Sequence, residues 1–286
     1  GENAVAIGLQ SGQINQDSNS ISIGSYAGQQ FQGSGSVAIG LNAATTNQGV
    51  NSLAVGPFAG QQSQGSGSIA LGYAAGSSDQ GLQSIAIGYG AANANQNDSA
   101  IAVGFQAGNV GQGSGGIAIG TNAGGFIQSI QAVAVGTEAG ATNQGSGSVA
   151  MGYQAGSFSQ SYDSVAIGSH AGQSSQANSS VAIGSYAGNE NQGAGSVAIG
   201  SQCGQFSQSF SAVAIGNLAG YTNQGAMSIA IGDSAGQYNQ SGGIAIGDNA
   251  GRTGQQASAV ALGSSAGNVD QSANAIAIGN NAGNTT

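Results

Sequence analysis

Short apolar triplets recur along the whole chain at a fixed interval. Each triplet is a Val or Ile, an Ala and a second aliphatic residue, followed at once by glycine, as in Ser-Val-Ala-Ile-Gly at 36–40. These landmark glycines are sixteen residues apart from Gly8 to Gly232, fifteen apart between Gly232 and Gly247, and sixteen apart again to Gly279. A fixed short period of this kind predicts a stack of similar units and not a globular domain.

Each triplet predicts a short β-strand that ends at its landmark glycine. The β-branched residues favour a pleated backbone, and the alternation of side chains places the two bulky residues on one face and the Ala on the other. Glycine then allows a bend that a side chain would hinder. A more polar extended segment follows, so that one unit forms either two short strands with two turns or a three-sided coil. The turn glycines include Gly40, Gly88, Gly136, Gly184 and Gly232.

One such coil cannot fold alone, because burial of a Val and an Ile does not offset the entropy lost by sixteen ordered residues. Stacked coils gain backbone hydrogen bonds to the coils above and below them. We therefore expect an all-β fold: a parallel β-solenoid (β-roll) of about 18 coils, with 16 residues per coil. We expect it to run as a single continuous solenoid over residues 1–286, with one 15-residue repeat between Gly232 and Gly247.

A glutamine follows each landmark glycine by eight residues wherever the chain reaches that position. Stacked glutamines predict a structural ladder, in which each amide donates to the next coil and accepts from the previous one, so that the coils stay in register. The alternative is a polar surface stripe that binds a ligand. The predicted ladder comprises Gln16, Gln32, Gln48, Gln64, Gln80, Gln96, Gln112, Gln128, Gln144, Gln160, Gln176, Gln192, Gln208, Gln224, Gln240, Gln255 and Gln271.

The triplet is apolar on both faces, and this predicts self-association. If Val and Ile fill the coil, the Ala residues form an apolar stripe outside; if Ala lies inside, the Val and Ile residues are outside. In both cases a long apolar stripe is exposed, which soluble monomers rarely tolerate. We expect lateral association with copies of the same chain, for which a trimer is one symmetric solution.

Composition removes several classes of function. Charged residues make up 4% of the chain, and a formal net charge of −9 with one Arg and no Lys leaves no basic surface for nucleic acid or anionic lipid. No apolar run is long enough to cross a membrane. His170 reads as a variable surface residue and Cys203 as a small buried one. We expect no catalytic site, no cofactor and no metal site.

Aromatic residues near the glutamines form a second pattern. Phe126 with Ile130, Phe158 with Tyr162, and Phe206 with Phe210 are pairs four residues apart across the turn that follows Gln. Each pair predicts either a local apolar clasp or a contact with a neighbouring subunit.

The motif Ser-Val-Ala-Ile-Gly-x-x-Ala at a short period resembles the head repeats of YadA-like trimeric autotransporter adhesins. That resemblance implies a left-handed parallel β-roll, trimeric assembly, a cell-surface location and binding of host matrix or cells. The family repeat is typically shorter and lacks the added Gln. The longer motif, Ala-Ile-Gly-x-x-Ala-Gly-x-x-x-Gln-Gly, is also similar to repeat-rich fibre proteins of large DNA viruses, which implies a virion surface.

The leading functional hypothesis is a structural subunit of an extracellular fibre or filament, assembled laterally through apolar strand faces and axially head-to-tail. The chain spans almost a whole number of coils, so we expect either end-to-end stacking or a segment of a longer repetitive polypeptide. The alternative is an adhesin head whose variable turn residues bind a surface receptor. An ice-binding solenoid is less favoured, because the Thr residues do not line one strand.

Overall fold

A computed structural model describes residues 1–284 of the chain. This part consists of strands and turns and contains no helix. It is an all-β parallel β-solenoid with about 16 residues per turn, which confirms the fold class expected from the repeat. The chain divides into two compact units, residues 1–147 and 148–286, which are described separately. The single continuous solenoid over residues 1–286 stays a prediction.

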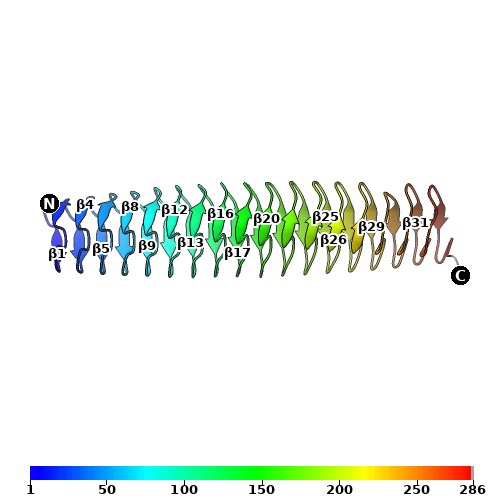
Figure 1. Cartoon of the computed structure of the whole chain (residues 1–286), viewed down its shortest axis with the longest axis horizontal. Helices are drawn as coiled ribbons and strands as arrows, with labels where there is room; N and C mark the ends of the chain where they lie inside the picture. The colour runs from blue at the N-terminus through cyan, green and yellow to red at the C-terminus, as the bar shows by residue number, and fades with distance from the viewer. Residues whose placement is uncertain (285–286) are drawn as a thin grey trace. The chain divides into compact units, whose positions relative to one another are not determined.

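The apolar triplets form one sheet in each unit, here called the aliphatic sheet (Figure 1). Successive strands are parallel and pair with exact repeat register, so that Val37 lies beside Leu53 and Ala38 beside Ala54. In unit 1 the strands are β1 (Val5–Ile7), β3 (Ile21–Ile23), β5 (Val37–Ile39), β7 (Leu53–Val55), β9 (Ile69–Leu71), β11 (Ile85–Ile87), β13 (Ile101–Val103), β15 (Ile117–Ile119) and β17 (Val133–Val135). In unit 2 they are β19 (Val149–Met151), β21 (Val165–Ile167), β23 (Val181–Ile183), β25 (Val197–Ile199), β27 (Val213–Ile215), β29 (Ile229–Ile231), β30 (Ile244–Ile246), β31 (Val260–Leu262) and β32 (Ile276–Ile278).

The polar segments form the second sheet of each coil, here called the glutamine sheet because each of its strands ends at the repeated Gln. It too is parallel and in repeat register, with Gln32 beside Gln48. Its strands in unit 1 are β2 (Ile14–Gln16), β4 (Gln30–Gln32), β6 (Thr46–Gln48), β8 (Gln62–Gln64), β10 (Ser78–Gln80), β12 (Ala94–Gln96), β14 (Val110–Gln112), β16 (Phe126–Gln128) and β18 (Thr142–Gln144). In unit 2 they are β20 (Phe158–Gln160), β22 (Ser174–Gln176), β24 (Glu190–Gln192), β26 (Phe206–Gln208) and β28 (Thr222–Gln224). Of the two coil shapes open from the sequence, the structure has two short strands joined by two turns.

The interior of each coil is narrow and is filled by small side chains. From β5 onward the Ala at the centre of each aliphatic strand is buried, and the Ala of the first turn is buried in the inner coils; Ala38 and Ala43 are both 0% exposed. Ser36, which precedes the strand, is also 0% exposed, and its hydroxyl donates to the carbonyl oxygen of Gly33 at 2.6 Å. The bulky residues of the triplet therefore face outward. The sequence left open which side chains fill the coil. In the structure Ala lies inside the coil, and Val and Ile lie outside.

Close stacking of the coils explains the landmark glycines. Gly120 has a φ of +126°, a conformation that is essentially restricted to glycine. A Cβ atom placed on Gly120 would lie 2.7 Å from the backbone oxygen of Gly136 in the next coil. The landmark position therefore excludes a side chain both by conformation and by lack of space.

Replacing Gly120 with Ala is expected to lower the free energy of unfolding by about 3 kcal/mol, because a strained conformation and a steric contact with Gly136 add up. Thermal and denaturant unfolding, followed by circular dichroism, measure the change. Ser114→Ala in the exposed turn of the same coil is the matched control and is expected to stay within about 0.5 kcal/mol of the wild type. Equal stability of both variants would contradict this account of the glycine.

The fifteen-residue repeat lies in unit 2 and shortens one turn. The turn between Gln240 and the strand that begins at Ile244 has one residue fewer than the turn between Gln224 and Ile229. The aliphatic sheet continues through β29, β30 and β31 in register. Beyond β28, within the described residues, the glutamine sheet continues as single bridges: Thr222 to Tyr238, Tyr238 to Thr253 and Thr253 to Val269.

Candidate functional site

The repeated glutamines occupy the centre of the coil. From Gln32 to Gln255 each is at most 3% exposed, while Gln16 is partly exposed and Gln271 is 7% exposed. The side-chain amide of Gln112 donates to the backbone carbonyl of Ile101 at 2.8 Å and to that of Gly116 at 3.1 Å. The first of these bonds recurs at every repeated Gln, always to the first residue of an aliphatic strand, eleven positions earlier. The amide therefore satisfies carbonyl groups that point into the coil.

Bonds between glutamines of adjacent coils are fewer than an uninterrupted ladder requires. In unit 1 they join Gln48 to Gln64, Gln96 to Gln112 and Gln128 to Gln144, at 3.0–3.2 Å. In unit 2 they form a continuous run from Gln192 to Gln271. The principal partner of the amide is thus the backbone, and the ladder of amides is secondary. That the glutamines stabilise the fold stays a prediction.

Replacing Gln112 with Leu removes an amide that serves the carbonyls of Ile101 and Gly116 and accepts a hydrogen bond from Gln96. We expect the free energy of unfolding to fall by about 1–3 kcal/mol, because buried polar groups are left unpaired. Gln62→Leu, at an exposed position of the glutamine sheet, is the control and should have little effect. The prediction fails if both substitutions change the unfolding midpoint equally.

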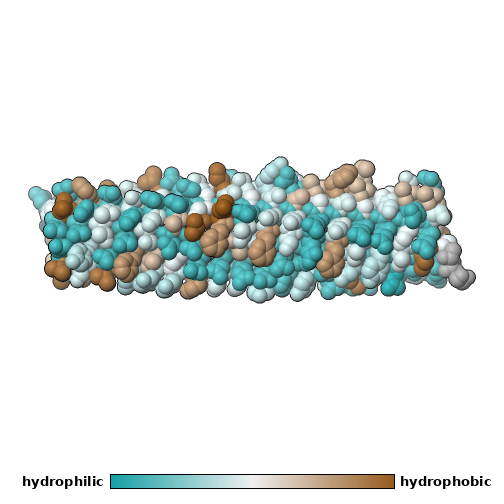
Figure 2. Space-filling view, viewed as in Figure 1, coloured by the Kyte–Doolittle hydropathy of each residue, from teal (hydrophilic) through white to brown (hydrophobic). Residues whose placement is uncertain are grey.

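The outward face of the aliphatic sheet is a regular apolar surface in each unit. Two ranks of aliphatic side chains run along it, and they are partly to substantially exposed: Ile39 is 37% exposed, and Leu71 and Ile119 are each 41% exposed. Figure 2 shows apolar side chains at the surface among polar ones on the face in view. Buried Ala on the inner side and half-exposed Val and Ile on the outer side give this sheet an unpartnered apolar face.

Aromatic rings form rows at the turn that follows the landmark glycine. In unit 1 the rings of Phe58, Tyr73, Tyr89 and Phe105 lie in sequence, with centroids 5.6, 4.9 and 5.4 Å apart. The last three of these residues are 45–52% exposed. Phe58 meets Tyr73 edge-on, whereas Tyr73 stacks on Tyr89 and Tyr89 stacks on Phe105.

His170 belongs to a second row, in unit 2. Its ring stacks on Tyr186 at 4.6 Å and meets Tyr153 edge-on at 5.2 Å, and its Nδ1 atom lies 2.8 Å from the hydroxyl of Ser169. The sequence predicted His170 to be a variable surface residue. The prediction overlooked that side chains at the first or second position after the landmark glycine lie next to one another in consecutive coils.

Cys203 takes the place of the buried turn Ala and is 0% exposed. Its thiol donates to the carbonyl of Gly200 at 3.1 Å, and burial raises the pKa of this thiol to about 12. The thiol therefore stays protonated and shielded from solvent near neutral pH, as expected of a small buried residue.

The aromatic pairs that flank the glutamines are mostly exposed. Phe126, Ile130, Phe158, Tyr162 and Phe210 are each 51–56% exposed, and Phe206 is partly exposed. The ring of Phe206 contacts Tyr221 of the next coil, with centroids 5.4 Å apart. Among the described residues, no ring contact joins Phe158 to Tyr162 or Phe206 to Phe210. The local clasp and the contact with a neighbouring subunit both stay predictions.

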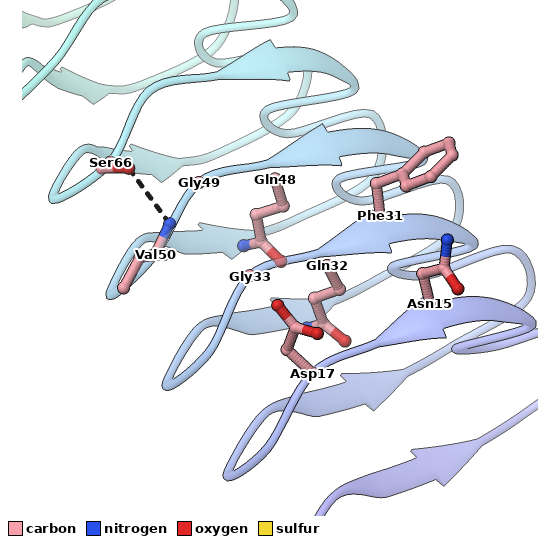
Figure 3. A pocket seen from close by; sticks show the side chains of 9 residues that line it. All are labelled: Asn15, Asp17, Phe31, Gln32, Gly33, Gln48, Gly49, Val50 and Ser66. Atoms are coloured by element: carbon pink, nitrogen blue, oxygen red, sulfur yellow. Dashed lines mark hydrogen bonds between the residues drawn. The ribbon is translucent and has the colours of Figure 1, made fainter. Parts of the chain in front are cut away.

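An open hollow of about 450 Å³ lies beside the glutamine sheet near the start of unit 1 (Figure 3). Asn15, Asp17, Phe31 and Val50 are among its lining residues, and the backbone N–H of Val50 donates to the hydroxyl of Ser66 at 3.2 Å. The hollow contains one carboxylate, which provides no acid–base pair for catalysis.

Within residues 1–284, no group of three or more His, Cys, Asp or Glu side chains is placed to hold a metal ion. The same residues include no helix that is long and apolar enough to cross a membrane.

Comparison with known families agrees with the sequence motif. Residues 32–59, 63–91, 129–155 and 144–171 match the model of the YadA head domain repeat, and together they cover less than half of the chain. No curated protein sequence matches the chain. The first matched segment holds β5, β6 and β7, so that the match covers both sheets and a buried Gln. The chain therefore contains segments similar to YadA head domain repeats, which confirms the resemblance inferred from its motif.

Proposed function

We propose that the chain is a structural subunit of an extracellular fibre whose copies associate laterally through the aliphatic sheet. The observation that carries this proposal is the outward face of that sheet, where Val and Ile residues are exposed while the Ala residues fill the coil. A contiguous apolar face of this kind marks an interaction surface in soluble proteins. No charged residue interrupts the triplets themselves.

A trimer is the assembly that we favour. Heads built from the YadA repeat are trimers exposed at the cell surface, and the matched segments of this chain include the strands of the aliphatic sheet. Rotational symmetry brings the same face of each copy to a common axis and so covers all apolar faces at once. The proposed location is therefore a cell surface, with a virion surface as the alternative that the longer motif favours.

Substituting Ile39, Leu71 and Ile119 together with Thr tests the lateral contact. Threonine keeps the β-branched shape that suits a strand but adds a hydroxyl that is costly to bury. We expect the oligomer to dissociate into folded monomers, as measured by sedimentation velocity and circular dichroism. The control carries Thr at the exposed turn residues Ser66, Ser114 and Ser146 and should assemble as the wild type does. A monomeric wild type, or an intact oligomer of the triple variant, would refute the proposal.

An adhesin head is the second candidate. The exposed aromatic rows favour it, because aromatic side chains are enriched where proteins bind partners.

Two experiments distinguish the candidates. Immunogold electron microscopy of native material distinguishes a cell surface from a virion surface, and binding of the purified oligomer to whole cells and matrix preparations tests adhesion. Fibres with regular coil spacing across several copies, and no binding, would favour the structural role and end-to-end contact. Saturable binding that is lost when Tyr73, Tyr89 and Phe105 become Ser would favour the adhesin.

A further inference from the structure

A compact apolar patch lies on the glutamine sheet of unit 1, away from the aliphatic sheet. Phe126, Ile127 and Ile130 are 54%, 59% and 56% exposed, and Val110, which pairs with Phe126 on the neighbouring strand, is 36% exposed. We call these four residues the Phe126 patch. It lies on β14, β16 and the turn after β16, and the lateral contact proposed above does not use it.

The backbone at Ile127 makes this patch unusual. Ile127 has a φ of +56°, in the left-handed region, where a β-branched residue is a genuine outlier. Most coils place a small polar residue or glycine at the same position, for example Ser63, Asn95, Gly111 and Asn143. Asn and Gly tolerate this conformation and Ile does not. The side chain of Ile127 is 59% exposed and so gains little packing within its own chain to offset the strain, and such outliers cluster at functional sites.

The surroundings of the patch suit contact with an identical chain. Each copy has a net charge of −9, so that like charges oppose close approach at most surfaces. Between Asp98 and Glu138, however, the chain contains no charged residue. Two copies related by a two-fold axis can therefore bring this patch against itself without placing carboxylates together.

We propose that the Phe126 patch is a second self-association surface, at which another copy of this chain docks through the same patch. Four side chains provide much less than the roughly 800 Å² per partner of a stable interface. The contact is therefore weak for one pair of chains and becomes effective between assemblies that present several patches at once. Phe158 with Tyr162, and Phe206 with Phe210, occupy equivalent coil positions in unit 2 and extend the same type of surface.

The test replaces the patch with the residues of the next coil, which carries Thr142, Asn143 and Ser146 at the equivalent positions. The variant is Phe126→Thr/Ile127→Asn/Ile130→Ser in the full chain. Sedimentation velocity over a concentration series resolves the basic oligomer from larger species. We expect the wild type to form larger species as its concentration rises, and the variant to need at least a tenfold higher concentration while its basic oligomer stays intact.

Three further measurements make the result specific. The control Gln62→Thr/Ser63→Asn, made at the same positions of a coil without the patch, should associate as the wild type does. Ile127→Asn alone should raise the melting temperature by a few degrees, because the strain is relieved, and still weaken association. Added NaCl should leave association unchanged or strengthen it, since it screens the repulsion between acidic copies. The proposal is overturned if the wild type forms no larger species, or if the patch variant associates as readily as the wild type. It is also overturned if the control associates less than the wild type, or if added salt weakens association.

Discussion

The hydrogen bond from a glutamine amide to a backbone carbonyl recurs at every repeated Gln, and we expect the rest of the structure to depend on it. A coil with two three-residue strands is too narrow for a conventional apolar core, and some of its carbonyl groups point inward. An unpaired carbonyl in that position would cost about 1–3 kcal/mol. The amide of each repeated Gln donates to the first residue of an aliphatic strand, and in many coils also to the residue before the next aliphatic strand, as Gln112 does to Ile101 and Gly116. The remaining interior can then be filled by Ala, Ser and Gly.

That interior determines the surface. Because only small side chains fit inside, the bulky residues of every triplet must face outward, so that the fold itself generates an apolar face. Burial of that face requires another molecule, and a protein with one Arg and no Lys has little opportunity to cover it with salt bridges or long charged side chains. Stability within the chain and the proposed association between chains thus have a common cause. The turn residues and the outward residues of the glutamine sheet vary between coils, and the aromatic rows and the Phe126 patch lie at those variable positions.

The period of the sequence was sufficient to predict the strands, their parallel pairing and their register, since every triplet aligns with the next. The alternation of side chains places Val and Ile on one face of the strand and Ala on the other, but it does not determine which face lies inside the coil. The narrow interior, which accepts only small side chains, determines that Ala lies inside. The bond from Gln to the backbone could not be foreseen either, because the acceptor is eleven residues away and becomes a neighbour only after the turn closes. The left-handed backbone conformation of the residue before each Gln was not predicted either. Asn and Ser are common in any turn, so their presence at this position does not by itself indicate a positive φ; it becomes evident because Ile127 and Phe31 adopt the same conformation.

The fifteen-residue repeat shows which contacts between coils are retained when one residue is lost. Loss of one residue after Gln240 coincides with the point at which the ladder of the glutamine sheet gives way to single bridges. The amide of Gln240 nevertheless bonds to the carbonyls of Ile229 and Gly243 and to the side chain of Gln255, each at 2.9 Å. The aliphatic strands on both sides of the deletion also remain paired residue by residue. We therefore expect a coil to tolerate a shorter turn and a weakened second sheet as long as the buried amide reaches its carbonyls and the aliphatic strands stay paired, because both kinds of contact are retained across the deletion.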